Sequence, residues 1–148
     1  MTPLIKVKRL HPDAKLPRYS HCGAWGDLAA DLSAVAAATL APAGDSGSTQ
    51  AISTGIALEL PETHGALVED RSGLAMRGIT TLAGVIDPGY RGEIKVVVTN
   101  LSAAEVEVKA GDRIAQLRIV QRFLARFDEV SELVEAPRGA AGFGSTGS

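Results

Sequence analysis

The chain of 148 residues has a single cysteine, Cys22, and few aromatic residues, which make up 4% of it. One cysteine excludes a disulfide framework and a cysteine-rich zinc site within one chain. No segment approaches the roughly 20 apolar residues that a membrane span needs. The N-terminus also has no apolar stretch long enough for a secretory signal. We therefore expect a cytoplasmic domain that does not bind membranes.

The chain also lacks an excess of charge of either sign. Lys and Arg number 15 and Asp and Glu number 17, so the formal net charge is −2. A protein that coats nucleic acid needs a basic excess to neutralise phosphates, so we expect no nucleic-acid partner. The hydrophobic share of 45% is ordinary for a globular protein, and the length fits one domain.

The 16 glycines and 7 prolines are spread along the chain, which indicates short elements joined by turns and favours an all-β fold. The clearest predicted strand covers residues 93–99, where apolar β-branched residues alternate. Further strands are expected at residues 5–10, 56–60, 106–108 and 114–120, with a loop at 41–49. Residues 28–40 are rich in alanine, the best helix former, so composition alone permits a helix there as readily as extended chain.

Two segments place polar side chains beside turn-forming residues, where these side chains can meet a phosphate or the metal ion bound to it. Asp31 stands between apolar residues, where a carboxylate can hold a magnesium-bound water, or can simply cap a turn or meet solvent. Farther along, Gly73 lets the backbone approach a ligand closely. Arg71 and Ser72 beside it can donate hydrogen bonds to phosphate oxygens. Alternatively, Ser72 caps a helix that begins at Gly73.

The segment 84–92 has two apolar runs around an Asp-Pro-Gly-Tyr turn, a pattern that predicts a β-hairpin. Asp87 is either a plain turn residue or a carboxylate held rigidly at a strand end, where a general base can act. Tyr90 is placed to stack on a ring. In the segment 111–117, Gln116 is the polar exception in an apolar strand that follows a Gly-Asp turn.

The C-terminal stretch 138–147 is rich in glycine and also contains Ser and Thr. Backbone N–H groups in such a stretch can wrap a phosphate. Phe143 has nothing local to bury against, which suits a lid that stacks on a base. The alternative is a disordered terminus.

Taken in order, these five segments resemble the five motifs of the trimeric deoxyuridine triphosphate nucleotidohydrolases (dUTPases), over residues 5–148. The resemblance implies a jelly-roll-like β-barrel in residues 1–136 and extended chain, rather than a helix, at 28–40. It also implies a homotrimer with shared active sites. The flexible tail 137–148 of one subunit closes over the site of a neighbour.

The resemblance further implies that dUTP is hydrolysed to dUMP and diphosphate with Mg²⁺, which supplies dUMP for thymidylate synthesis and limits uracil in DNA. Asp87 orients and deprotonates the water that attacks the α-phosphorus, and Arg71 is the second catalytic residue. Asp31 holds the metal through water. The implied substrate-binding residues are Arg71, Ser72, Gly73, Thr81, Val85, Ile86, Asp87, Tyr90, Lys95, Gln116, Arg138, Phe143, Gly144, Ser145 and Thr146.

The chain departs from the family pattern at several positions. The first motif is lengthened, and Asp27 offers a competing alignment to Asp31. Asp70 stands where proline or glycine is common in the family. Cys22 and Trp25, in the lengthened region, receive no role from the resemblance.

Two other functions remain as alternatives. Deoxycytidine triphosphate deaminases share this fold, but their chemistry needs a glutamate in the strand after the turn. The matching position here is Val97, which cannot move a proton. The other alternative is a non-catalytic nucleotide-binding protein, against which Asp87, Arg71 and the tail argue.

Overall fold

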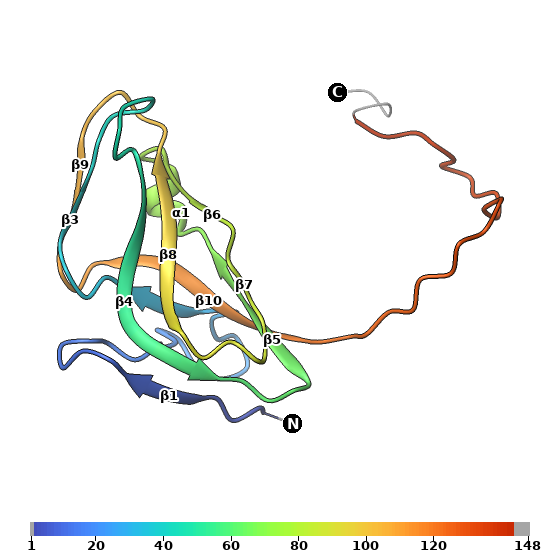
Figure 1. The fold of residues 1–148 in the computed structure, drawn as a ribbon, viewed down its shortest axis with the longest axis horizontal. Coiled ribbons are helices and arrows are strands. Elements are labelled where there is room, and N and C mark those ends of the chain that lie inside the picture. Colours follow the sequence, from blue (N-terminus) through green and yellow to red (C-terminus); the bar gives the residue numbers. More distant parts are fainter. Residues whose placement is uncertain (1, 144–148) are drawn as a thin grey trace.

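The computed structural model describes residues 2–143, which form almost only β-strands (Figure 1). In chain order the elements are β1 (Lys6–Arg9), β2 (Ala30–Ser33), β3 (Ala38–Leu40), β4 (Thr49–Glu59), β5 (His64–Glu69), α1 (Ser72–Ala75), β6 (Ile79–Leu82), β7 (Val85–Ile86), β8 (Glu93–Asn100), β9 (Val106–Val108) and β10 (Arg113–Gln121). The all-β prediction is confirmed. No helix among the described residues is long and apolar enough to cross a membrane.

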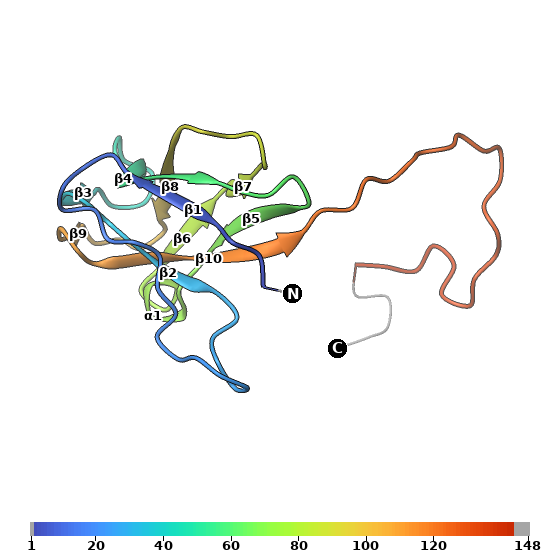
Figure 2. The same ribbon diagram turned by 90° about the horizontal axis from the view of Figure 1, so that it is seen from below.

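The strands form two four-stranded antiparallel sheets and one small ribbon. The first sheet has the order β1-β4-β8-β6, the second has the order β2-β10-β5-β7, and β3 pairs with β9. Seen edge-on, β1, β4 and β8 lie in one layer and β2 and β10 in the other (Figure 2). Apolar side chains of both layers meet in one core, to which Leu32, Ile56, Leu58, Val68, Ile94, Val96, Val98, Ile114 and Leu117 belong.

The strand predicted at residues 93–99 is confirmed as β8 and shows why alternation is a strong signal. Ile94, Val96 and Val98 are at most 1% exposed, whereas the side chains between them are partly or fully exposed. Alternation in β4 is interrupted, because the register against β8 shifts between Ser53 and Ala57. The buried run that results lies between the two neighbouring strands β1 and β8.

The helix that composition permitted at residues 28–40 does not form, and the extended chain implied by the family resemblance is confirmed. The segment contains β2, which pairs with β10, and β3, which pairs with β9. Ala30, Leu32 and Ala34 are at most 5% exposed. The burial and pairing that these neighbours offer outweigh the intrinsic helix preference of alanine.

The turn predicted within residues 84–92 is present, but the hairpin is wrong. The Tyr90 N–H donates to the Asp87 carbonyl at 3.1 Å, which closes the turn. The strands on either side do not pair with each other: β7 pairs with β5, and β8 pairs with β4 and β6. The turn therefore passes from one sheet to the other.

An extended arm follows the last strand. β10 ends at Gln121, and residues 122–143 contain no strand or helix and run away from the barrel (Figure 1). The arm nevertheless carries apolar side chains. Phe123, Phe127, Leu133 and Val134 are between 80% and 97% exposed. Within one chain these side chains have no core to join.

Asn100, at the end of β8, provides a test of the packing. Its side chain is 1% exposed, donates to the carbonyls of Ala41 (2.9 Å) and Ala104 (2.7 Å), and accepts from Ser102. We expect Asn100→Ala to lower the free energy of unfolding by at least about 2 kcal/mol, because each buried group left without a partner costs about 1–3 kcal/mol. Urea titration at fixed protein concentration measures the change.

The matched control is Ser102→Ala, which removes one hydroxyl but leaves the two carbonyls bound. It should cost about 1 kcal/mol, the usual net value of one hydrogen bond. Equal decreases in the free energy of unfolding in the two variants would show that the bonds from Asn100 to the two carbonyls do not stabilise the fold.

Candidate functional site

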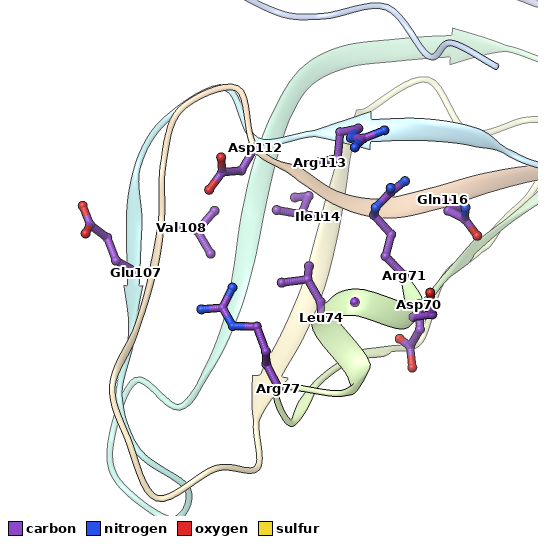
Figure 3. Close-up of a pocket in the computed structure, with 12 residues that line it drawn as sticks. Asp70, Arg71, Leu74, Arg77, Glu107, Val108, Asp112, Arg113, Ile114 and Gln116 are labelled. Atoms are coloured by element: carbon purple, nitrogen blue, oxygen red, sulfur yellow. The ribbon is translucent and has the colours of Figure 1, made fainter. Parts of the chain in front are cut away.

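The first pocket, here the α1 pocket, is a cavity of about 540 Å³ between α1 and the segment from β9 to β10. Figure 3 shows Arg71, Arg113 and Gln116 on one side of it and Arg77 on another. Three arginines and three carboxylates line the cavity together with smaller groups. The full set is Asp70, Arg71, Ser72, Gly73, Leu74, Arg77, Glu107, Val108, Asp112, Arg113, Ile114 and Gln116.

The carboxylate of Asp31 in β2 holds two of these arginines side by side. Arg71 donates to one of its oxygens, while Arg113 donates to the other at 3.2 Å. The hydroxyl of Ser20 also donates to that second oxygen at 3.0 Å. A guanidinium has five N–H donors, so both arginines keep donors for a ligand.

Ser72 and Gly73 leave open space beside these arginines. The residue before α1 is Arg71, and no side chain caps the helix, so the predicted Ser72 cap is wrong. A Cβ atom at Gly73 would meet nothing within 4 Å. Ser72 and Gly73 thus line the pocket, with open space beside Gly73.

Arg113 and Gln116 share this pocket because β10 is irregular. The register against β2 shifts between Arg113 and Ala115, and both Ile114 and Ala115 are buried. This bulge turns residues that are three positions apart toward the same side. Sequence reasoning selected Gln116 but missed Arg113, because strict alternation places the two on opposite faces.

The second pocket, here the Tyr90 pocket, has a volume of about 180 Å³ and is lined by Val85, Ile86, Asp87, Tyr90, Glu93 and Lys95. The Tyr90 hydroxyl donates to the backbone carbonyl of Glu93 at 2.9 Å, which folds the ring back over the turn. Asp87 is exposed at the start of that turn. Glu93 is the lining residue that sequence reasoning did not select.

The structure groups the predicted site residues in two places. Arg71, Ser72, Gly73 and Gln116 line the α1 pocket, whereas the residues predicted between 85 and 95 line the Tyr90 pocket. The other predicted residues lie elsewhere: Thr81 donates to Asp70, Arg138 donates to the Ala141 carbonyl, Phe143 is exposed on the arm, and Gly144, Ser145 and Thr146 lie outside the described residues. Neither of these two pockets contains both Asp87 and Arg71.

The carboxylates of the first motif have different surroundings. Asp27 accepts from the His21 N–H at 2.8 Å, and this bond with the contact to the His21 ring holds the pKa of Asp27 below its usual value. Asp27 thus closes a surface loop, and Asp31 is the aspartate that contacts Arg71.

The part of the chain that the structure describes offers little protein coordination for a metal. The described residues contain no group of three His, Cys, Asp or Glu side chains able to hold a metal ion. Mg²⁺ keeps several waters and commonly uses one or two carboxylates together with substrate phosphates. A single carboxylate acting through water, as predicted for Asp31, is compatible with such a site once phosphates are bound.

Comparison with known proteins identifies the family. The dUTPase family model matches residues 20–147. The chain belongs to the dUTPase family. Two relatives are named deoxyuridine 5'-triphosphate nucleotidohydrolase. The one from Thermobifida fusca is 47% identical over 99% of this chain and 80% of its own length. The one from Solibacter usitatus is 45% identical over 97% of this chain and 95% of its own length.

Solved dUTPase structures have the same fold. The dUTPase of Staphylococcus bacteriophage 80alpha with dUpNHpp superposes with a TM-score of 0.85 and 25% identity, over 99% of this chain and all of the other. A mutant dUTPase of phage phi11 of S. aureus, whose structure concerns the coordination of a structural Mg(II) ion, has a TM-score of 0.74 and 24% identity over 87% of this chain and 97% of the other. The jelly-roll-like fold expected for a dUTPase is thereby confirmed.

Gly92 provides a test of the Tyr90 pocket of this dUTPase. A Cβ atom at Gly92 would lie 2.5 Å from the Tyr90 hydroxyl oxygen, closer than real contacts allow. We expect Gly92→Ala to displace the Tyr90 ring and break its bond to the Glu93 carbonyl, which a crystal structure of the variant would reveal. Gly89→Ala in the same turn is the control, because a Cβ there meets nothing within 4 Å. An unmoved ring in Gly92→Ala would contradict the argument.

Proposed function

We propose that the chain hydrolyses dUTP to dUMP and diphosphate at a site completed between subunits. The observation that carries the proposal is the division of the motif residues between two solvent-accessible pockets. One offers arginine, serine and backbone donors, which suit phosphates, and the other offers a carboxylate beside a tyrosine. Family membership supports the substrate. The product, dUMP, feeds thymidylate synthesis, and removal of dUTP limits uracil in DNA.

Asp87 acts as the general base in this proposal. It takes a proton from a water that attacks the α-phosphorus in line with the bond to the bridging oxygen. That bond breaks, and the electron pair leaves with diphosphate. Arg71, which Asp31 keeps oriented, donates hydrogen bonds to the phosphate oxygens as charge develops. Mg²⁺, when bound, supplies further neutralisation of phosphate charge, and Asp31 would hold it through water.

The Tyr90 pocket selects the nucleoside. The backbone between Ile86 and Lys95 forms hydrogen bonds with the edge of uracil. A backbone N–H that donates to the 4-carbonyl of uracil would face the 4-amino group of cytosine, which is also a donor. The ring of Tyr90 packs on the deoxyribose and leaves no room for a ribose 2'-hydroxyl. A thymine 5-methyl group would clash in a cavity of only about 180 Å³. Phe143 of the tail stacks on uracil, while Arg138, Ser145 and Thr146 bind phosphates.

A homotrimer would bring the two pockets together. Asp87 of one subunit would then face Arg71 of a neighbour, and the tail of a subunit would close the site. The exposed apolar side chains of the arm support association, because patches of this kind mark interaction surfaces. Closed symmetry is the norm for homo-oligomers.

The two alternatives are less well supported. Deamination of dCTP in the related deaminases needs a glutamate at one position of the strand after the turn, and the matching position here is Val97 in β8. A non-catalytic nucleotide-binding protein would have no need for a carboxylate at position 87. Neither alternative accounts for the residues as fully as hydrolysis does.

Product analysis tests the reaction. We expect chromatography after incubation with Mg²⁺ to show dUMP and diphosphate from dUTP, and little product from dCTP, dTTP or UTP. Asp87→Asn should bind dUpNHpp normally yet turn over at least about 10²-fold more slowly, the usual contribution of a positioned base. Orthophosphate from dUTP, or ammonia from dCTP, would exclude the proposed reaction. Near-normal turnover by Asp87→Asn would remove that residue from the base's role.

Two truncations test the assembly. A chain ending at Pro137 keeps the apolar arm, so light scattering should show a trimer whose kcat has fallen because the tail cannot close the site. A chain ending at Gln121 also loses the arm, and we expect weaker association. An active monomer at assay concentration would contradict shared sites. Full turnover by the Pro137 truncation would show that the tail has no part in closure.

A further inference from the structure

Asp70 connects the two sheets beside the α1 pocket. It follows β5, whereas its carboxylate binds the middle of β6, which belongs to the other sheet. One oxygen accepts from the Thr81 N–H at 2.5 Å and the Thr81 hydroxyl at 2.7 Å, and the other accepts from the Thr80 hydroxyl at 2.7 Å. β5 and β6 are not paired with each other in the described sheets, so this carboxylate ties them directly.

The residues on either side of Asp70 are tied to other strands. Glu69 receives two bonds from Arg118 of β10, at 2.9 and 2.5 Å, and Arg118 holds the pKa of Glu69 below its usual value. Arg71 pairs with Asp31 of β2. Three consecutive side chains thus attach the end of β5 to three different strands. The next residue in the chain, Ser72, is exposed.

We propose that Asp70 is a positioning residue, whose carboxylate, bound to Thr80 and Thr81, fixes the Arg71-Ser72-Gly73 turn in the geometry that binds the substrate's phosphates. This inference rests on the proposed function and adds a residue to it. It also gives Thr81 a role, since both of its donors serve Asp70 rather than a ligand.

The charge of Asp70 is compatible with an anionic ligand nearby. Partial burial alone would raise the pKa of Asp70, but the bonds from Thr81 and Thr80 outweigh burial and hold the pKa below its usual value. The group is therefore ionised at neutral pH, and its charge is spread over three donors. In Figure 3 its carboxylate points away from Arg71 and Arg113, so it does not compete with phosphates for those guanidinium groups.

The turn has enough backbone bonding to survive the loss of the carboxylate. The Ala75 N–H donates to the Arg71 carbonyl at 2.9 Å, and the Met76 N–H donates to the Ser72 carbonyl at 3.0 Å. Beyond α1, the Leu101 N–H donates to the Gly78 carbonyl at 2.8 Å. Removing the carboxylate should therefore leave the turn formed but free to shift relative to β6.

The test compares a ligand with phosphates and one without. In Asp70→Ala the Kd for dUpNHpp, measured by calorimetry with the full chain, should rise about tenfold, as it does when a group that orients a metal ligand is removed. The Kd for deoxyuridine should stay unchanged. Asp70→Asn should restore most of the affinity, because its oxygen still accepts from Thr81 and its amide can donate to the Thr80 hydroxyl. Asp45→Ala, an exposed carboxylate elsewhere, is the matched control.

Thr81→Val provides a second route to the same contact. It should raise the Kd for dUpNHpp less than Asp70→Ala does. The double variant should have the same Kd as Asp70→Ala alone, because both substitutions remove the same contact between Asp70 and Thr81. Equal losses for dUpNHpp and deoxyuridine, tighter dUpNHpp binding in both Asp70 variants, or additive losses would each overturn the proposal. Such a result with normal dUTP hydrolysis by the wild type would overturn the role of Asp70 and leave the proposed function intact. If the wild type converted no dUTP, the proposed function would fail instead.

Discussion

The ion pair of Asp31 with Arg71 joins β2 to a turn that is not part of its β-ladder, and the ion pair with Arg113 strengthens the β2–β10 ladder. β2 supplies the carboxylate, β10 supplies one arginine, and the turn after β5 supplies the other. A carboxylate with 14% of its side chain exposed needs such partners, because burying an unpaired charge is costly. Without the Asp31 carboxylate, the two neighbouring guanidinium groups would repel each other. The placement of Arg71 and Arg113 in the α1 pocket depends on this balance.

The division of the motif residues follows from the two-sheet architecture. Both turns pass from the sheet of β5 to the sheet of β8, but the Arg71 turn connects β5 to β6 and the Asp87 turn connects β7 to β8. A barrel of this size presents the two turns in separate pockets. The proposed association of identical chains would combine them without any further residue in the chain.

Sequence reasoning succeeded where a local pattern fixes the structure. Alternation identified β8, and the Asp-Pro-Gly-Tyr run identified the turn at Asp87, because both signals act over a few residues. It failed where distant strands decide. The alanines of residues 28–40 became strands through pairing with β9 and β10, and Arg113 joined Gln116 only through a bulge in β10. The ties of Asp70 were also hidden, because Thr80 and Thr81 lie ten or more positions away.

The position of the apolar arm at the C-terminal end has a consequence for biosynthesis. Every strand of both sheets precedes residue 122, and a chain leaves the ribosome from its N-terminus. The exposed Phe123 and Phe127 therefore follow every described strand in the order of synthesis. Exposed apolar side chains at the start of the chain would instead be present while the core is still incomplete. Aggregation competes best with folding in that situation. Here the exposed apolar side chains come after the last strand of the core.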